Sequence, residues 1–429
     1  ALGLIAEGET FLEQVLAALG PSHDVTQQHV RLRGWALAEL ARFQFGRGKP
    51  QQGLANAEAA VAAAERAADR DGLVAGYLTT GYAYTLLGDL ARAQSWLERG
   101  LALAETASLH HAPAPGHGMA IMLPMLHNSL AMVAVGGRQF TAAATHEAHL
   151  RALNQANGDW WGMALAAWWA GGAYLRIGHY SHALAWYSEM LEAAERLGVG
   201  WYARDCQIRI GQCLTRLGQY EAAAATLEQA LASSRAAGSE NQACLALSGL
   251  SLVASYGGDY TAALRHGRAA SELASTLEPH ASGQLTALIA LGQALLGLGQ
   301  AAQASAVYAD ALQRCRDNFG SVFLCECLCG RAAAALLAGD RAGARKAAEG
   351  LLERVGHLRC DALVSPAEVG LVCYRVLAAD GDARAQTVLE RAQSVVREQA
   401  AWIAEPDLRR AFLEEFPAHR ALLAVAVGE

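Results

Sequence analysis

A glycine followed by a polar residue, and often by an aromatic one, recurs through nearly the whole chain. The clearest copies are Gly178-His179-Tyr180, Gly218-Gln219-Tyr220 and Gly258-Asp259-Tyr260. The full series is Gly48, Gly88, Gly137, Gly178, Gly218, Gly258, Gly299, Gly339 and Gly381. Successive glycines are 40, 49, 41, 40, 40, 41, 40 and 42 residues apart. A fixed period of this length is typical of repeat proteins, in which similar units stack side by side.

Each unit is predicted to be a pair of antiparallel helices, the first of which ends at the glycine, where a left-handed cap costs nothing. Small residues recur where the two helices must approach each other closely. Seven residues before the glycine stand Gly81, Gly171, Gly211, Ser251, Gly292 and Ala332, and five after it stand Ala93, Ala142, Ala183, Ala223, Ala263, Ala304 and Ala344. We therefore expect an all-α, right-handed superhelical solenoid of about nine helical hairpins with a period of about 40 residues.

The same ladder divides the chain into segments. Residues 1–24 are expected to form an N-terminal cap, residues 25–400 the repeats, and residues 401–429 a C-terminal capping helix and tail. The single long interval has a cause, an inserted loop at 108–118 that holds Pro113 and Pro115. Proline prevents helix continuation, so this loop is expected to be exposed and more mobile than the other turns.

One motif in this ladder is typical of a known family. Gly211, Gly218-Gln219-Tyr220, Ala223 and Ala230 resemble a tetratricopeptide repeat, and so do Gly171, Tyr174 and Gly178-His179-Tyr180. The period of 40 exceeds the usual 34 of that family. Longer repeats of this kind resemble the sensor solenoids of bacterial signalling (STAND-type) ATPases, including maltose-activator-like transcription regulators and ATPase–cyclase fusions.

Both ends support the narrower resemblance. The segment that starts at Gly8-Glu9-Thr10-Phe11 resembles the start of such a solenoid, and Glu405-Pro406-Asp407-Leu408 with Pro417-Ala418-His419-Arg420 resembles its closing helix. The resemblance implies a non-catalytic regulatory domain that senses a protein, a peptide or an inducer. Because the sequence starts at Ala1 in a helix-like stretch, we expect it to be a piece of a longer protein. The resemblance implies that a nucleotide-binding domain precedes it.

The sequence shows no chemistry of an enzyme. It has no G-x-x-x-x-G-K-[ST] phosphate loop, no G-x-S-x-G elbow and no H-E-x-x-H zinc motif. The net charge is −7, and no basic stripe with interleaved aromatic residues is present, so binding of nucleic acid is not expected. We predict no enzyme activity, no cofactor and no metal.

The cysteines and histidines are interpreted in structural terms. Nine cysteines lie within apolar helical stretches, which favours reduced thiols and a cytoplasmic location. Cys325 and Cys329 share a helix face while Cys327 points elsewhere, so buried thiols are a better interpretation than a zinc site. The pairs His146/His149 and His179/His182 have a spacing that could hold a metal, but no third ligand is apparent. The uncharged stretches 106–137 and 160–175 are interpreted as buried helices and not as membrane spans.

The first helix of each unit is expected to line the concave groove of the solenoid. Counting back from each glycine gives the candidate groove residues Tyr82, His127, Trp161, Trp168, Trp169, Trp201, Asp205, Arg209 and Gln212. Six of the nine tryptophans fall between Trp160 and Trp201, and Trp161, Leu165 and Trp168 share one helix face. Trp160 is expected to point into the core. Aromatic surfaces of this kind suit adaptable peptide binding.

Alternatives remain open at this point. The tryptophans could fill a wide core between repeats, and Asp205 and Arg209 could simply pair with each other. Three functions fit the sequence: a regulatory solenoid that binds a protein or peptide in the groove, a small-molecule or inducer-binding module with a Trp/Met-lined pocket, and a scaffold for self-association. If the tryptophans are structural, the inserted loop with His110, His111 and His117 is the next candidate surface.

Overall fold

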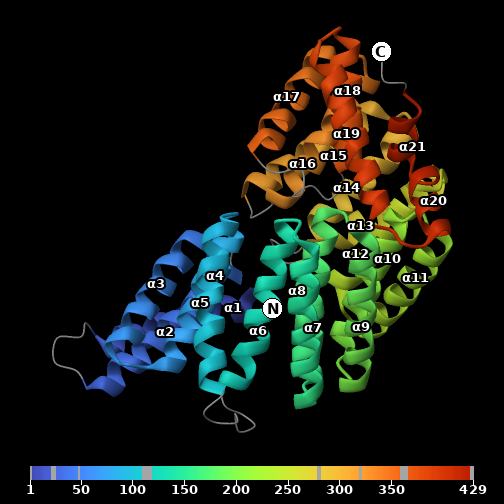
Figure 1. The fold of residues 1–429 in the computed structure, drawn as a ribbon. Helices are drawn as coiled ribbons and strands as arrows, with labels where there is room; N and C mark the ends of the chain where they lie inside the picture. The colour runs from blue at the N-terminus through green and yellow to red at the C-terminus, as the bar shows by residue number, and fades with distance from the viewer. Residues whose placement is uncertain are drawn as a thin grey trace. The chain divides into compact units, whose positions relative to one another are not determined.

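The computed structural model describes residues 2–20, 26–46, 49–108, 118–277, 282–317, 321–357 and 366–425. Within these ranges all regular structure is helical, with 21 α-helices and no strand (Figure 1). The chain forms two compact units, Ala1–Ala170 and Gly171–Glu429, each of which is described by itself. The boundary falls inside helix α8, so the periodicity in the sequence gives no sign of it.

The first unit contains a leading helix and three hairpins, which are repeats one to three, and the first part of α8. Its helices are α1 (Leu2–Leu19), α2 (Gln27–Gly46), α3 (Pro50–Arg66), α4 (Arg70–Leu86), α5 (Leu90–Ser108), α6 (Gly118–Gly136), α7 (Phe140–Asn157) and α8 (Trp160–Ile177). The inserted loop lies between α5 and α6, and residues 109–117, including its three histidines, are outside the described residues.

The second unit completes repeat four, adds repeats five to nine and closes with two short helices. Its helices are α9 (Tyr180–Leu197), α10 (Gly200–Arg216), α11 (Tyr220–Ala236), α12 (Glu240–Tyr256), α13 (Tyr260–Ala274), α14 (Ser282–Gly297), α15 (Ala301–Asp317), α16 (Ser321–Leu337), α17 (Arg341–His357), α18 (Pro366–Ala379), α19 (Arg384–Ala401), α20 (Pro406–Glu414) and α21 (Pro417–Leu423). The predicted all-α solenoid of nine helical hairpins is confirmed. The predicted segment limits at residues 24 and 400 stay a prediction.

Within a repeat the two helices pack on each other, and the first helices of consecutive repeats also touch, as α10, α12, α14, α16 and α18 do. This contact between first helices is what places them on the inner side of a curved repeat array. We therefore call the first helices (α2 to α18, even numbers) the inner helices, and the second helices the outer helices.

The turn between the inner and the outer helix of each repeat explains why the glycines recur. It also corrects the predicted position of the turn in one repeat. Gly88, Gly178, Gly218, Gly258, Gly299, Gly339 and Gly381 all have positive φ. In repeat three the residue with positive φ is Arg138, with φ of 58°, and not Gly137. Counting from Gly137 therefore displaced this repeat by one residue. The buried small residue is Ala143, which is 0 % exposed, whereas the predicted Ala142 lies on the exposed face.

The small positions allow close packing between the two helices of a hairpin. A Cβ atom on Gly211 would lie 2.5 Å from Leu227, and one on Gly292 would lie 2.6 Å from Tyr308. Both large partners come from the outer helix nine residues after the turn glycine. A missing side chain on one helix thus makes room for a large one on the other, and this pairing holds each hairpin together.

The alanine five residues after the turn glycine tests directly which face of the outer helix is buried. Ala223 is fully buried and its neighbour Ala222 is exposed on the same helix, α11. We expect Ala223→Leu to lower the free energy of unfolding by about 1–3 kcal/mol, because overpacking forces neighbours apart. Ala222→Leu should change it by less than about 0.5 kcal/mol. Chemical denaturation of both variants checks this, and equal effects would show that the register is wrong.

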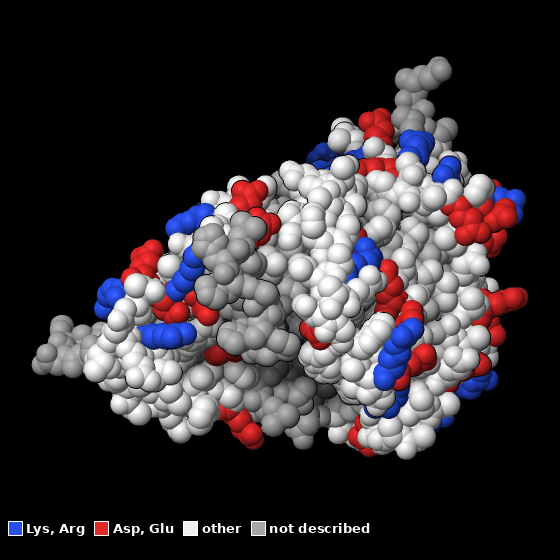
Figure 2. Space-filling model, turned by 60° about the horizontal axis from the view of Figure 1, so that its bottom comes forward, with Lys and Arg blue, Asp and Glu red and all other residues white. Residues whose placement is uncertain are grey.

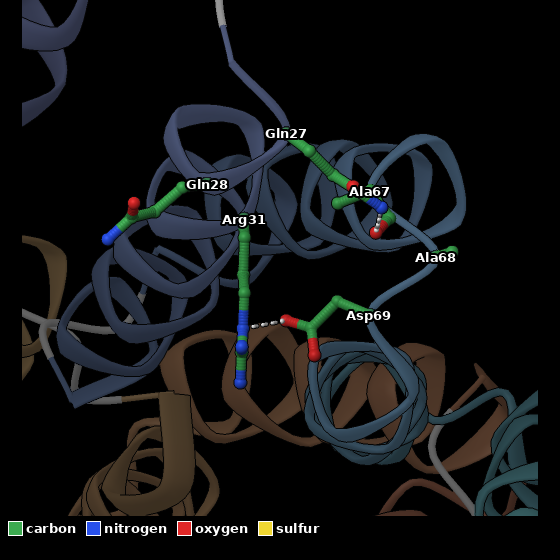
Figure 3. Close-up of a pocket in the computed structure, with 6 residues that line it drawn as sticks. All are labelled: Gln27, Gln28, Arg31, Ala67, Ala68 and Asp69. Atoms are coloured by element: carbon green, nitrogen blue, oxygen red, sulfur yellow. Dashed lines mark hydrogen bonds and ion pairs between the residues drawn. The ribbon is translucent and has the colours of Figure 1, made fainter.

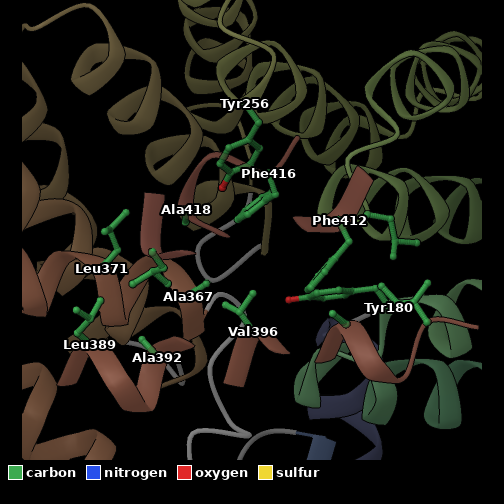
Figure 4. Close-up of a cluster of buried hydrophobic side chains, with 14 residues drawn as sticks. Tyr180, Tyr256, Ala367, Leu371, Leu389, Ala392, Val396, Phe412, Phe416 and Ala418 are labelled. Carbon is green, nitrogen blue, oxygen red and sulfur yellow. The ribbon is translucent and has the colours of Figure 1, made fainter. Parts of the chain in front are cut away.

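Helices α20 and α21 close the second unit on itself. Phe412, Phe416 and Leu422 are almost fully buried, in a cluster with Tyr180 and Tyr256 from repeats four and six (Figure 4). The Tyr220 hydroxyl donates to the Glu415 carbonyl at 3.0 Å, and Gln399 Nε2 donates to the Ile177 carbonyl at 3.3 Å. The end of the chain is therefore bound to the repeats at which this unit begins.

The cysteines within the described residues are free thiols, and all eight are buried. Cys325 and Cys329 lie in one hydrophobic cluster with Cys373, while Cys327 lies in another with Cys315. The predicted division of this cysteine group between two helix faces is confirmed. Cys360 is outside the described residues.

Candidate ligand-binding surfaces

Three aromatic side chains from three inner helices meet in the first unit. The ring centroids of Phe45 and Tyr82 are 5.6 Å apart, and those of Tyr82 and Trp169 are 5.5 Å apart, both edge to face. Tyr82 comes from α4 and Trp169 from α8, so the contact joins helices that are two repeats apart. Tyr82 and Trp169 are both half-buried. Two of the predicted groove residues are thus brought together on the inner side.

The predicted stripe on α8 is partly exposed. Trp161 is 50 % exposed, and Leu165 and Trp168 are half-buried. Trp160 was expected in the core, and this is wrong, because it is 37 % exposed. It is the first residue of α8, directly after the turn at Gly158, and the start of a helix is less covered by its own helix than its middle. The stripe offers apolar surface that a ligand could cover.

His127 is buried, at 5 % exposure, and belongs to a group of three histidines from α6 and α7. Its Nδ1 lies 3.1 Å from Nδ1 of His146, and its ring stacks on His149 at 5.0 Å. Burial and the two neighbouring imidazoles lower the pKa of His127 to about 4. No group of three or more metal-ligating side chains in the described residues is arranged to hold a metal ion. Burial also lowers the pKa of His146, so the lowered pKa values favour the neutral form of His127 and His146.

In the second unit, α10 presents the predicted residues Trp201, Asp205, Arg209 and Gln212. Trp201 is 44 % exposed, whereas Asp205 is buried. Arg209 Nε lies 3.6 Å from Asp205 Oδ2, and Arg209 donates to Gln212 Oε1 at 3.4 Å. Burial raises the pKa of Asp205 in spite of the arginine. The pairing of Asp205 with Arg209, which the sequence left open, is present.

A second charged group on the inner helices was not predicted. Arg216 at the end of α10 donates to Glu368 Oε2 of α18 at 2.9 Å and to the Tyr256 hydroxyl at 3.2 Å. The Tyr256 hydroxyl in turn donates to Glu368 Oε1 at 3.0 Å. The guanidinium also lies 5.3 Å from the ring of Phe416. This group connects three repeats, five, six and nine, with one another and with the C-terminal segment.

One inner position carries acidic residues in three repeats of this unit. Asp205, Glu326 and Glu368 all stand 13 residues before their turn glycine. Asp205 is paired with Arg209, and Glu368 with Arg216. Glu326 Oε2 is buried and has no hydrogen-bond donor within the described part of the chain. Burial raises the pKa of Glu326 to about 7; Arg216 opposes this rise and Glu368 adds to it.

This perturbed carboxyl predicts a pH dependence of stability. The usual pKa is 4.5, so as pH rises the unfolded chain loses its proton before the folded one does. The contribution of Glu326 to the free energy of unfolding is therefore most favourable below pH 4.5, and it is lost progressively as the pH rises to 7. The free energy of unfolding of Glu326→Gln should exceed that of the wild type by roughly 3 kcal/mol at pH 8. At pH 4.5 the two free energies of unfolding should be equal. Denaturation at both pH values measures this, and an equal effect at the two values contradicts it.

The first unit also has a hollow of about 480 Å³ beside the start of α2. Its polar groups already bind one another, as Figure 3 shows. Arg31 Nε lies 3.2 Å from Asp69 Oδ2, and Gln27 Nε2 donates to the Ala67 carbonyl at 2.6 Å. Trp35 Nε1 donates to the same Asp69 oxygen at 2.9 Å. The charges are compensated within the wall, so the hollow offers little to a small charged ligand.

Other surface features do not single out a site. On the face drawn in Figure 2, basic and acidic side chains are interspersed among wide uncharged areas. Among the described helices, none is long and apolar enough to cross a membrane. The inner helices therefore hold the main candidate surfaces: an aromatic one in the first unit and a charged one in the second.

A match to a known family of repeats identifies this fold. A family model of the tetratricopeptide repeat matches residues 205–236, which lie in α10 and α11. No curated protein matches the sequence. The fold is a tetratricopeptide-repeat solenoid, as the ladder predicted.

Solved structures share the fold at low sequence identity. A Rap protein complexed with competence and sporulation factor has a TM-score of 0.52 and 14% identity, over 88% of this chain and 100% of that one. The Rap conjugation gene regulator of plasmid pLS20, in complex with the Phr* peptide, has a TM-score of 0.50 and 14% identity, over 78% of this chain and 95% of that one. A STAND protein with a tetratricopeptide repeat sensor from Pyrococcus horikoshii is also similar, at 14% identity over 91% of this chain and 56% of that one, with a TM-score of 0.41.

Proposed function

We propose that this chain is a regulatory repeat domain that binds a peptide, or an extended segment of a protein, along its inner helices. The observation that carries the proposal is the half-exposed aromatic surface of the first unit, formed by Trp161, Leu165 and Trp168 with Trp169 against Tyr82. Aromatic side chains of this kind anchor ligands because they bury a large area at low entropic cost.

Two further points support a peptide over a small molecule. The one hollow described above has its charges already paired, whereas the aromatic surface extends over several turns of α8. The solved pLS20 regulator of the same fold holds a peptide. We also propose that the chain works as the sensing part of a larger cytoplasmic signalling protein, such as a STAND-type ATPase or transcription regulator. Its buried free thiols suit a reducing compartment.

The test uses an array of random peptides of about ten residues, probed with the whole chain. Peptides that bind are then titrated in solution by tryptophan fluorescence. We expect Trp168→Ala to weaken their binding by about 2 kcal/mol, which is roughly 30-fold, because a central aromatic anchor is lost. Its cost in stability should stay below the roughly 3–5 kcal/mol of a fully buried aromatic residue, since Trp168 is only half-buried.

Trp96 supplies the matched control. It is half-buried like Trp168, but it lies on the outer helix α5, where it packs beside Tyr77 and Arg99. Trp96→Ala should leave peptide affinity unchanged. If Trp168→Ala binds as well as wild type, or if both tryptophan variants lose affinity equally, the inner aromatic surface is not the binding surface.

A further inference from the structure

Two of the three acidic residues at one recurring inner position of the second unit are paired with an arginine within the described residues, and the third is not. This position, 13 residues before each turn, holds Asp205, Glu326 and Glu368. Arg209 pairs with Asp205, and Arg216 pairs with Glu368. The two oxygens of Glu368 are both occupied, one by Arg216 and one by the Tyr256 hydroxyl. This leaves Glu326 as the acidic residue of the series without a matching cation.

The surroundings of Glu326 make its charge costly. The residue is on α16, and Oε2 is buried without a hydrogen-bond donor in the described residues. Arg216 acts on it from a distance but is already engaged with Glu368. A buried carboxylate without a donor is destabilising, so such a group is expected where a ligand supplies the missing partner.

The group is still within reach of a ligand. Glu326 is half-buried as a whole, and the side chains of Arg216 and Glu368 are 12% and 21% exposed.

We propose that Glu326 binds a basic group of the ligand, a guanidinium or an ammonium, on the inner face of the second unit. This deepens the proposed function and rests on it: a ligand of the inner helices of the second unit would carry an arginine, a lysine or a free amino terminus at this point. An anionic ligand group would meet Glu326 and Glu368 together and be repelled. A neutral amide would satisfy the oxygen but leave the charge uncompensated.

The experiment uses Nα-acetylated argininamide as the probe (below, argininamide) and Nα-acetylated citrullinamide as the reference (below, citrullinamide), which has an uncharged side chain of the same shape. Binding to the whole chain is measured by calorimetry at pH 8. We expect argininamide to bind at least tenfold more tightly than citrullinamide. Glu326→Gln should remove this preference. Glu390→Gln should keep it, since it makes the same change of charge on the exposed outer face of α19, where Glu390 accepts a bond from Gln386.

The pH profile separates this site from general attraction to an acidic chain. Argininamide affinity for wild type should fall as pH is lowered from 8 to 6, because Glu326 takes up a proton. Affinity for Glu326→Gln should be flat over this range. Absence of argininamide binding to wild type, or equal binding to wild type and Glu326→Gln, overturns the proposal.

The outcomes also separate this inference from the proposed function. Peptides that bind through Trp168 but show no need for a basic residue and no effect of Glu326→Gln would overturn the inference and leave the function standing. If no peptide of the array binds, the proposed function fails, whatever argininamide does.

Discussion

Phe412→Ala is expected to lower the free energy of unfolding by about 3–5 kcal/mol, the usual cost of removing a fully buried aromatic side chain. Phe412 is 0 % exposed and packs against His419 at 4.1 Å between ring centroids and against Tyr180 at 6.2 Å. His419 Nδ1 lies 2.7 Å from the Phe412 carbonyl oxygen, and an alanine at this position keeps that backbone group, so the expected loss comes from the ring contacts. Chemical denaturation measures the effect.

Phe11→Ala provides the control for this prediction. Phe11 is 63% exposed on α1, and its replacement should change stability by no more than about 0.5 kcal/mol. A Phe412→Ala variant as stable as the Phe11→Ala variant would mean that the C-terminal helices do not pack on repeats four to six in solution.

Gly218→Ala is expected to be more damaging than the same change at the equivalent turn glycine Gly258. Gly218 has a φ of 77°, which costs an alanine roughly 1–2 kcal/mol. A Cβ there would also lie 2.7 Å from the Ala411 carbonyl oxygen and 2.9 Å from Glu415 Cβ. This second cost falls on the contact between repeat five and the C-terminal helices, and overpacking adds about 1–3 kcal/mol.

Gly258→Ala isolates the first of the two costs. Gly258 has a φ of 88° at the equivalent turn one repeat later, and a Cβ there meets nothing within 4 Å. We expect Gly218→Ala to lose at least twice as much unfolding free energy as Gly258→Ala. Equal losses in a thermal or chemical denaturation series would show that the backbone conformation alone matters and that the contact with α20 does not.

The repeat pattern predicted the helices well because it reports local requirements. A turn needs a residue that accepts positive φ, and closely packed helices need small side chains. Glycine and other small residues therefore recur in the sequence at a fixed spacing. Among the turn residues that the structure describes, the predicted position is displaced in repeat three, where Arg138 takes the left-handed conformation that glycine takes in repeats two and four to nine. A non-glycine residue at that position leaves no mark that a glycine count can detect.

The sequence named Tyr82 and Trp169 as groove residues, and their rings are in contact; it left the pairing of Asp205 with Arg209 open, and that pair is present. That these residues bind a ligand stays a prediction. Arg216 and Glu368 were missed because they are 152 residues apart, and a periodic sequence describes neighbours along the chain and not how the array closes. The signal that could have found Glu368 is its offset, 13 residues before Gly381, which it shares with Asp205 and Glu326. Trp160 was misplaced because helix periodicity does not predict how far neighbouring elements bury a side chain at the end of a helix.

Hydrogen exchange of the whole chain, with and without a peptide selected from the array, tests the central claim most directly. If a ligand binds the aromatic surface of the first unit, amide protection should rise in the inner helices α4 and α8 and stay unchanged in the outer helices α5 and α7. Protection confined to the outer helices, or spread equally over both sets, would contradict the account.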